Sequence, residues 1–219
     1  LEVNQGTYYG ITMSDGTVVI NTQPSASAQT VCVGTPLTPL TVTTTGTIVT
    51  YQWFSNTTNT NSGGTTITNT TTTYTPLSNT PGTYYYYVEV RNGATGGATA
   101  CNTTPSNVAT ITIHPLPVIT SANFATENVC VGTTATSMTA SATTTTGTIT
   151  GYQWYRNSSN SYTGATQILN ETNATFTPPT STTGTTFYFC EITNSWGCKT
   201  NTAISGAINV YAAPVITTQ

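Results

Sequence analysis

The chain of 219 residues carries very little charge. Asp, Glu, Lys and Arg together make up 4% of it, whereas ordinary soluble domains contain about 25%. Its three basic side chains stand far apart, at Arg91, Arg156 and Lys199. Binding to a phosphate backbone takes clusters of Lys and Arg. This scarcity therefore excludes nucleic acid as a partner, and it also argues against an electrostatic membrane anchor.

Long apolar runs and helical periodicity are also absent. No stretch approaches the ~18 apolar residues that a membrane-spanning helix needs, so we expect no membrane insertion. Apolar residues instead alternate with Thr, as in Thr110-Ile111-Thr112-Ile113, which is the pattern of a strand with one buried face. The chain starts at Leu1 without an initiator Met or a signal segment, and we expect it to be a processed product.

Side chains that carry out chemistry are few. His114 is the only His and Asp15 the only Asp, and their separation does not favour a Ser-His-Asp arrangement. Glu89 and Glu191 fall in different halves of the chain, so they do not form a glycosidase pair. The scattered acids do not favour a calcium site, and neither a phosphate loop nor a zinc spacing occurs. We therefore predict that the protein is not an enzyme and has no cofactor and no metal.

The chain does contain an internal repeat. Tyr51-Gln52-Trp53 returns at Tyr152-Gln153-Trp154, Cys32-Val33-Gly34-Thr35 returns at Cys130-Val131-Gly132-Thr133, and Cys101 matches Cys198. A period of about 100 residues that carries several matched landmarks indicates two copies of one domain.

The repeat divides the chain into four parts: an N-terminal extension (1–17), a first domain (18–116), a second domain (117–213) and the lead-in strand of a further repeat (214–219). The extension is either the tail of a preceding domain or a strand that completes a neighbour's sheet. The lead-in strand is inferred because Val215-Ile216-Thr217 repeats Val118-Ile119-Thr120. The Pro residues of the join His114-Pro115-Leu116-Pro117 favour a stiff connection.

Short segments rich in Thr, Val, Ile and Tyr, separated by turn residues, predict an all-β fold. We expect strands in the first domain near 18–22, 37–43, 48–54, 65–75, 83–91 and 108–113. In the second we expect them near 117–121, 136–142, 149–155, 166–176, 185–193 and 204–211. This pattern is typical of two tandem immunoglobulin-like β-sandwiches joined by a short Pro-containing linker.

The predicted core centres on the two repeated tryptophans. Trp53 and Trp154 fall where an immunoglobulin-like sandwich buries a Trp on its third strand. On a later strand Val88 aligns with Cys190, and we expect both to face the core. Cys190 is then a small buried residue, with an intermolecular or reactive thiol as the alternative.

Four of the five cysteines follow the repeat. We expect one bridge in each domain, Cys32–Cys101 and Cys130–Cys198, each worth about 4 kcal/mol by closing a loop of about 70 residues. Two reduced pairs at equivalent positions are the alternative. Oxidised pairs would imply an extracytoplasmic location.

Surface candidates are aromatic rings and sequons. Tyr85 and Tyr87 should point away from the core, where they either bind a sugar or a partner or pack across strands. Six Asn-x-Ser/Thr sequons occur, about as many as the composition gives by chance, and O-linkage to Thr is equally open. The sequons are at Asn56, Asn69, Asn102, Asn157, Asn170 and Asn173.

Several strings together resemble a known family. These are Cys-Val-Gly-Thr, Tyr-Gln-Trp followed by Phe or Tyr, Asn-Ser-Gly-Gly, Gly-Thr-Tyr-Tyr-Tyr-Tyr and Pro-x-Val-Ile-Thr. Over residues 18–219 the chain resembles the immunoglobulin-like tandem repeats of giant Bacteroidota surface proteins, including gliding-motility adhesins and proteins exported by type IX secretion. The resemblance implies an extracellular or cell-surface location and an adhesive or spacer role. It supplies no catalytic residue.

These observations lead to one function hypothesis and two alternatives. The first is a non-enzymatic, extracellular structural or adhesive segment of a bacterial cell-surface protein or fibre, whose partners are neighbouring repeats or identical subunits. One alternative is a filament subunit in which residues 1–17 or 214–219 add a strand to the next copy. The other is a carbohydrate-binding accessory module of a secreted enzyme, which would bind glycans through Tyr85 and Tyr87.

Overall fold

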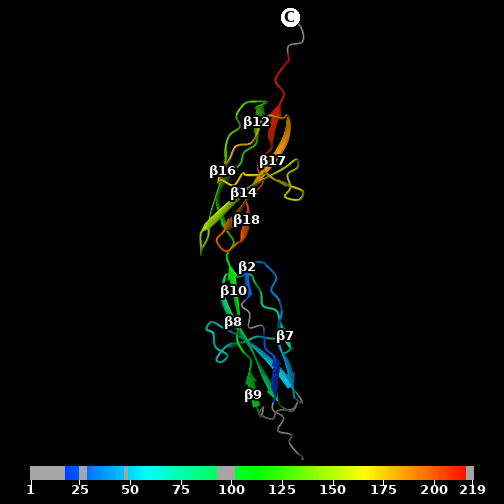
Figure 1. Ribbon diagram of the computed structural model, residues 1–219, viewed down its shortest axis with the longest axis vertical. Coiled ribbons are helices and arrows are strands. Elements are labelled where there is room, and N and C mark those ends of the chain that lie inside the picture. Colours follow the sequence, from blue (N-terminus) through cyan, green and yellow to red (C-terminus); the bar gives the residue numbers. More distant parts are fainter. Residues whose placement is uncertain (1–17, 25–28, 47–48, 93–101, 216–219) are drawn as a thin grey trace, which may run out of the picture. The chain divides into compact units, whose positions relative to one another are not determined.

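The structure is a computed structural model that describes residues 18–24, 29–46, 49–92 and 102–215, with the side chains of Asn102 and Asn123 left out. Within these residues all regular structure is β-strand (Figure 1), and no helix capable of spanning a membrane occurs among them. The proposed donor strand at 1–17, most of the lead-in strand and Cys101 lie outside the described residues.

The first repeat forms one large and two small sheets. The small sheets pair β1 (Val19–Thr22) with β4 (Thr43–Thr45), and β3 (Leu40–Thr41) with β7 (Thr73–Tyr74). The large sheet has the order β2 (Gln29–Cys32), β10 (Ala109–His114), β8 (Gly82–Asn92), β5 (Val49–Asn56) and β6 (Thr65–Thr66), and β9 (Asn102–Pro105) pairs with β8. These sheets form an immunoglobulin-like β-sandwich.

The second repeat has the same plan with fuller pairing. One sheet has the order β11 (Val118–Asn123), β13 (Met138–Thr143) and β16 (Thr175–Phe176). The other has the order β12 (Glu127–Cys130), β19 (Ile208–Tyr211), β17 (Gly184–Asn194), β14 (Ile149–Asn157) and β15 (Thr166–Gln167), with β18 (Lys199–Asn201) on β17. β12 and β19 run parallel, and the other pairings within this repeat are antiparallel.

The boundaries of the two compact units of the structure differ slightly from those of the two sequence repeats. One compact unit takes most of the first repeat. The second takes residues from Ile113 onward together with Val31–Thr35 and Ser78–Pro81. We call this second body the C-terminal unit. Cys32 therefore belongs to the C-terminal unit, although it lies in the first sequence repeat.

The two repeated tryptophans explain the Tyr-Gln-Trp motif. Trp53 and Trp154 are fully buried, and each indole N–H donates to a backbone carbonyl, that of Thr71 at 2.9 Å and that of Asn173 at 2.8 Å. The preceding Gln side chain donates to two carbonyls in the first repeat and to three in the second. The motif thus satisfies the polar groups around a large buried ring.

Cross-strand register places the predicted core partners opposite the tryptophans. Trp53 lies opposite Val88, and Trp154 lies opposite Cys190. Val88 and Cys190 are both fully buried. In each repeat a buried hydroxyl accepts from the backbone N–H of this residue, at 3.0 Å from both Ser106 and Thr202. The hydroxyl continues the hydrogen bonding where the strand ladder ends.

Several strand predictions need correction. The expected strands 65–75 and 166–176 are each two short strands separated by turns, and four strands were not predicted: β2, β9, β12 and β18. β2 and β12 were missed because the entering strand changes sheets. Its first part pairs with β4 or β13, and its second part pairs with β10 or β19. The second part, Gln-Thr-Val-Cys or Glu-Asn-Val-Cys, has too few apolar residues to stand out by alternation.

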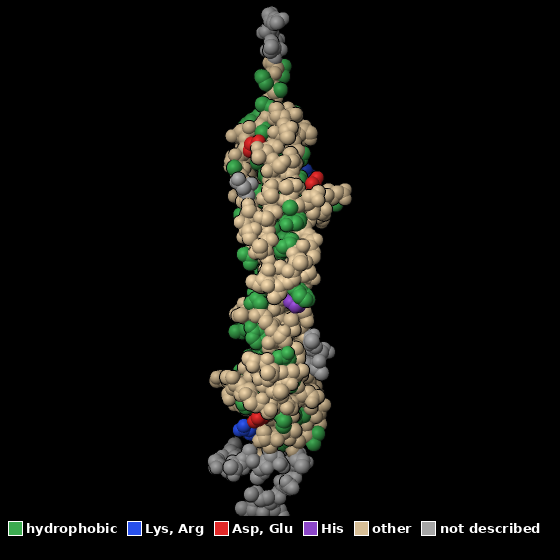
Figure 2. Space-filling view, turned by 90° about the vertical axis from the view of Figure 1, so that its left-hand side faces the viewer, with side chains coloured by type: hydrophobic (Ala, Val, Ile, Leu, Met, Phe, Trp, Pro, Cys, Tyr) green, Lys and Arg blue, Asp and Glu red, His purple; other side chains and the backbone are tan. Residues whose placement is uncertain are grey.

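The surface is polar without being charged. On the face drawn in Figure 2, hydroxyl, amide and backbone atoms predominate and charged side chains are few. Among the described residues two ion pairs involve equivalent glutamates. Glu89 pairs with Arg91 within β8 at 2.8 Å, and Glu191 on β17 pairs with Lys199 on β18 at 2.7 Å; both pairs are partly exposed. Such pairs contribute little to stability, so the strand ladders and buried rings hold these sandwiches together.

Candidate functional site

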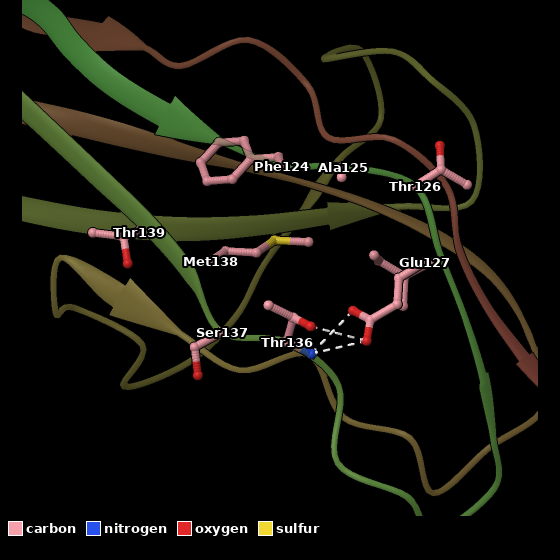
Figure 3. A pocket seen from close by; sticks show the side chains of 9 residues that line it. Phe124, Ala125, Thr126, Glu127, Thr136, Ser137, Met138 and Thr139 are labelled. Carbon is pink, nitrogen blue, oxygen red and sulfur yellow. Dashed lines mark hydrogen bonds between the residues drawn. The ribbon is translucent and has the colours of Figure 1, made fainter.

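A pocket of about 390 Å³ lies in the second sandwich beside Phe124, Met138 and Ile208 (Figure 3). Its one carboxylate, Glu127, accepts hydrogen bonds from the backbone N–H of Thr136 at 3.0 Å and from its hydroxyl at 3.1 Å. No group of three or more His, Cys, Asp or Glu gathers anywhere in the described part of the chain.

The same contact recurs in the first repeat without a charge. Gln29 accepts from the backbone N–H of Thr38 at 2.9 Å and donates to its carbonyl at 3.2 Å. Gln29 and Thr38 occupy the positions of Glu127 and Thr136. Because Gln and Glu hold the same turn, the role of Glu127 is to fix the connection between β12 and β13.

Of the two alternatives for Tyr85 and Tyr87, cross-strand packing describes Tyr87. Tyr87 is 1% exposed, which favours the cross-strand packing alternative over binding for this residue, while Tyr85 is half-buried. The ring of Tyr87 stacks on Phe54 with centroids 5.0 Å apart, and its hydroxyl accepts from the backbone N–H of Gly64 at 3.1 Å. The β5–β6 loop thus covers this part of the sheet. Any Cβ at Gly64 would lie 2.8 Å from the Ser55 carbonyl oxygen.

The second repeat covers its sheet by a related arrangement. Phe189 stacks on Tyr155 at 5.0 Å and meets Tyr162 edge-on at 4.9 Å. The Tyr162 hydroxyl donates to the carbonyl of Thr202 at 2.8 Å. In both repeats an aromatic pair that looks exposed by alternation is therefore covered by the loop that follows.

Two of the sequon asparagines hold loops in place. The Asn56 amide donates to the carbonyls of Thr60 and Ser62, and the Asn157 amide donates to those of Ser161 and Thr163. A sugar on either amide nitrogen would remove a donor from this network. Asn69 is half-buried, Asn170 and Asn173 are exposed, and the side chain of Asn102 is outside the described residues.

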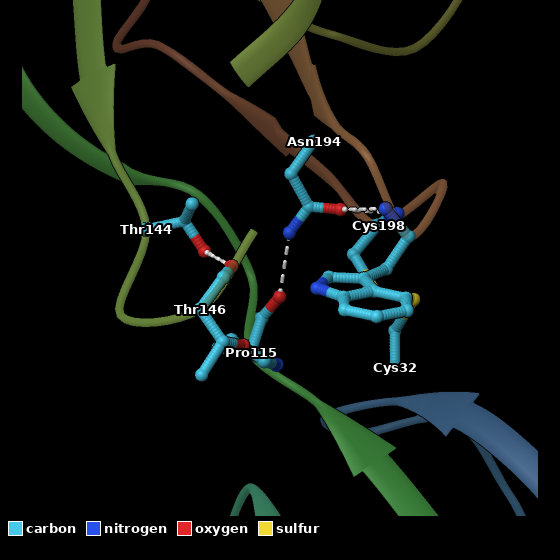
Figure 4. Close-up of a disulfide and its surroundings, with 7 residues drawn as sticks. Cys32, Pro115, Thr144, Thr146, Asn194 and Cys198 are labelled. Atoms are coloured by element: carbon cyan, nitrogen blue, oxygen red, sulfur yellow. Dashed lines mark hydrogen bonds between the residues drawn. A yellow bond between two sulfur atoms is a disulfide. The ribbon is translucent and has the colours of Figure 1, made fainter. Parts of the chain in front are cut away.

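The cysteine pairing differs from the prediction. Cys32 bonds to Cys198, with the Cα atoms 5.6 Å apart (Figure 4). Cys130 is an exposed free thiol. The predicted pairs Cys32–Cys101 and Cys130–Cys198 are therefore wrong. The repeat shows which cysteines are equivalent, but a bond between successive repeats satisfies that equivalence as well as a bond within one does.

A tight turn between β17 and β18 positions Cys198. Asn194 is 1% exposed, and its side-chain oxygen accepts from the backbone N–H of Trp196 at 3.0 Å and of Cys198 at 3.1 Å. Gly197 adopts φ 77°, which favours glycine. Asn194 and Trp196 were not among the predicted site residues. Their string, Asn-Ser-Trp-Gly-Cys, has no counterpart in the first repeat and could have marked them.

The turn also contacts the join within the C-terminal unit. The Asn194 amide donates to the Pro115 carbonyl at 2.9 Å, as Figure 4 shows. The Trp196 ring stacks on His114 with centroids 4.0 Å apart and planes 7° apart. A disulfide, a buried amide and an aromatic stack therefore hold the same few residues.

The residues that receive this turn have a fixed backbone of their own. The N–H of Val33 donates to the His114 carbonyl, and the N–H of Gly34 donates to the Ser78 carbonyl, both at 3.0 Å. The Ser78 hydroxyl donates to the Thr35 carbonyl at 2.6 Å. We call Cys32–Thr35, Ser78, His114 and Pro115 the Cys32 seat. A disulfide held in this way is typical of oxidising compartments, which indicates a non-cytoplasmic domain.

Cys190 is a different kind of thiol. It is fully buried opposite Trp154, and burial raises the pKa of its thiol from 9.0 to about 11. Its ionised, reactive form is therefore scarce at neutral pH. The reactive-thiol alternative for Cys190 has no support in this geometry.

Comparison with known proteins adds little to the fold. Residues 21–115 match the family described as "Domain of unknown function (DUF8696)", and no curated protein matches the chain. Similar solved structures include the fibronectin(III)-like modules of Clostridium thermocellum CbhA, at 12% identity over 93% of this chain and 98% of that one, with a TM-score of 0.38.

Two further solved structures are similar at the same level. The three N-terminal domains of the bacteriophage RB49 highly immunogenic outer capsid protein are 12% identical over 91% of this chain and 70% of that one, with a TM-score of 0.42. The insect immune protein hemolin is 13% identical over 93% of this chain and 49% of that one, with a TM-score of 0.47.

Proposed function

We propose that this chain is a non-enzymatic, load-bearing structural segment of an extracellular surface protein, of the tandem-repeat kind that Bacteroidota adhesins contain. The Cys32–Cys198 disulfide carries this proposal. Around it, two Trp-centred sandwiches present a nearly uncharged, Thr-rich surface, and no group of three or more His, Cys, Asp or Glu gathers among the described residues. The disulfide and the two buried tryptophans stabilise the fold.

The disulfide changes how tension passes along the chain. Its two cysteines are 166 residues apart in sequence, so everything between them forms one covalently closed loop. A force applied at the two chain ends passes through the sulfur–sulfur bond and bypasses that loop. Both buried tryptophans, Trp53 and Trp154, lie within the loop and are protected from the load.

Single-molecule stretching tests this role. With handles at the two ends, the oxidised chain should extend by roughly 550 to 600 Å less than the reduced chain, because 166 residues at about 3.3–3.6 Å each remain closed. The Cys32→Ser variant should behave like the reduced chain in either condition. The Cys130→Ser variant is the matched control and should behave like the unsubstituted protein.

Equal extension of the oxidised and reduced chains would overturn the load-bearing role. So would specific, saturable turnover of any substrate by the oxidised protein. A glycan array probed with the same material separates the carbohydrate-binding alternative, for which the burial of Tyr87 leaves only Tyr85 of the predicted pair.

A further inference from the structure

The end of β12 in the second repeat reproduces the Cys32 seat. Cys130 stands where Cys32 stands, and Tyr211 stands where His114 stands. The glycine after each cysteine adopts the same φ of 82°, at Gly34 and at Gly132. We call Cys130–Thr133, Thr180 and Tyr211 the Cys130 seat.

The hydrogen bonds of the two seats match one for one. Val131 N–H donates to the Tyr211 carbonyl at 2.9 Å, Gly132 N–H to the Thr180 carbonyl at 3.1 Å, and Thr133 N–H to the Cys130 carbonyl at 3.1 Å. The Thr180 hydroxyl donates to the Thr133 carbonyl, as Ser78 does to Thr35. The second seat is therefore as firmly built as the first.

The two seats differ in what covers them. At the Cys32 seat the Asn194–Cys198 turn supplies a disulfide to Cys32 and a Trp ring to His114. At the Cys130 seat the thiol is free and exposed, and the Tyr211 ring is 57% exposed, with Val131 beside it at 38%. An exposed thiol beside an exposed ring is the half-site that a second such turn would complete.

The sequence after Tyr211 indicates where that turn comes from. Pro214-Val215-Ile216-Thr217 follows Tyr211 at the spacing at which Pro117-Val118-Ile119-Thr120 follows His114. The segment that begins at Pro117 leads into the second domain, and the Asn194–Cys198 turn of that domain covers the Cys32 seat. The matching sequence after Tyr211 favours a domain of the same kind in the same place.

We propose that Cys130 forms a disulfide with a cysteine at the Cys198 position of a following immunoglobulin-like domain of the same chain, so that each repeat is bonded to the next. This inference rests on the proposed role as a repeat segment. The Tyr211 ring takes the place of His114 against an aromatic side chain of the incoming turn. The second repeat is then bonded to the third as the first is bonded to the second.

Bond formation is a balanced thiol–disulfide exchange. The Cys130 thiolate and the incoming cysteine replace the two halves of a small-molecule disulfide oxidant, such as glutathione disulfide. One protein disulfide forms, the oxidant's sulfur–sulfur bond breaks, and two molecules of the reduced thiol leave with the two protons. The same oxidant class makes Cys32–Cys198.

An extended chain tests the proposal. A second copy of residues 117–213 is joined directly after Ala213, in a Cys101→Ser background, and the protein is reduced, then reoxidised with glutathione disulfide. Alkylation followed by digestion without reduction and mass spectrometry identifies the linked peptides. We expect Cys130 joined to the appended copy of Cys198, loss of Cys130 alkylation, and an unchanged Cys32–Cys198 bond.

Two matched variants show which contacts matter. Replacing the appended Cys198 by Ser should restore full alkylation of Cys130. Tyr211→Ala should slow formation of the new bond while leaving the rate of Cys32–Cys198 formation unchanged, since Tyr211 lies outside the Cys32 seat.

The proposal is overturned if Cys130 stays alkylatable while the appended copy of Cys190 is protected, because that protection shows that the added domain has folded. It is equally overturned if Cys130 bonds to a separate chain. A second splice, with residues 123–213 joined after Gln219, keeps the native segment from Pro214 onward and covers misfolding at the first junction. The stretching difference due to Cys32–Cys198 would survive either failure, so the proposed function is judged separately.

Discussion

The Cys32 seat and the Cys130 seat have the same backbone geometry, but their cysteines differ in bonding. Cys32 and Cys130 end equivalent strands, are followed by glycines of the same φ, and have the same hydrogen-bond scheme. Yet Cys32 is bonded and Cys130 is free. The local sequence therefore determines the position of each cysteine, whereas the Cys32 bond also requires the Asn194–Cys198 turn of the second repeat.

The largest expected contrast is between removing one cysteine and removing the other. Cys32→Ser should lower the free energy of unfolding by up to about 5 kcal/mol, because the Cys32–Cys198 bond closes a loop of 166 residues in the unfolded chain. Cys130→Ser should change it by less than about 0.5 kcal/mol, as expected for an exposed site. Urea denaturation of the oxidised variants gives both values. Similar costs for the two variants would mean that the two seats do not differ in bonding.

The two tryptophans should show where the repeats are alike. Trp53→Ala and Trp154→Ala should each cost about 3–5 kcal/mol, because each removes a fully buried ring and leaves a cavity. Hydrogen exchange read separately in each repeat gives the local cost. A clear inequality would show that equal burial does not mean equal contribution, and it would weaken the case that the repeats are energetically equivalent.

The turn that covers the Cys32 seat should depend on its buried amide. Asn194→Ala should cost about 1–3 kcal/mol, because the Pro115 carbonyl and two backbone N–H groups lose their partner in a buried setting. Re-formation of Cys32–Cys198 after reduction should also slow. Ser195→Ala in the same turn is the control, because it removes one exposed hydrogen bond from the Thr148 N–H and no contact with Pro115 or Cys198; it should change that rate much less. A normal rate in Asn194→Ala would show that the disulfide alone orders the turn.

The sandwich architecture could be predicted because its signals are local and repeated. Alternation with Thr indicates strands, and Tyr-Gln-Trp in both copies indicates a buried ring on the third strand. Even the core position of Val88 and Cys190 follows from alternation. These features depend on the side chains of one strand and its immediate partner, so a single sequence contains them.

The cysteine partners and the covered tyrosine could not be predicted in the same way. Choosing Cys198 for Cys32 requires knowing that the Asn194 turn reaches across to Pro115, which is a long-range contact. Tyr87 reads as exposed because alternation cannot show that the β5–β6 loop, with Gly64 at its contact, folds over the sheet. In both cases the deciding partner is far away in sequence, and neither spacing nor composition identifies it.

The smallest expected contrast concerns Val88 and Cys190, which occupy the same core position in the two repeats. Burial raises the pKa of Cys190 from 9.0 to about 11, so the fold favours the protonated thiol. Because the pKa is higher in the folded state than in the unfolded state, the protonated Cys190 thiol contributes fully to the free energy of unfolding below pH 9. This contribution is lost as the pH rises towards 11. By pH 10 the loss should be about 1 kcal/mol.

The Cys190→Val variant isolates this contribution by giving the second repeat the residue of the first. Both proteins should carry Cys130→Ser, so that no exposed thiolate attacks the disulfide at high pH. The burial-raised pKa values of Tyr86 and Tyr188 are common to both proteins and cancel. Urea denaturation at pH 7.5 and pH 10 should show a larger loss of stability with Cys190 than with Val. If the two proteins lost equal stability between pH 7.5 and pH 10, the Cys190 thiol would have to reach solvent before the domain unfolds. The core around Cys190 would then be less tightly closed than the core around Val88.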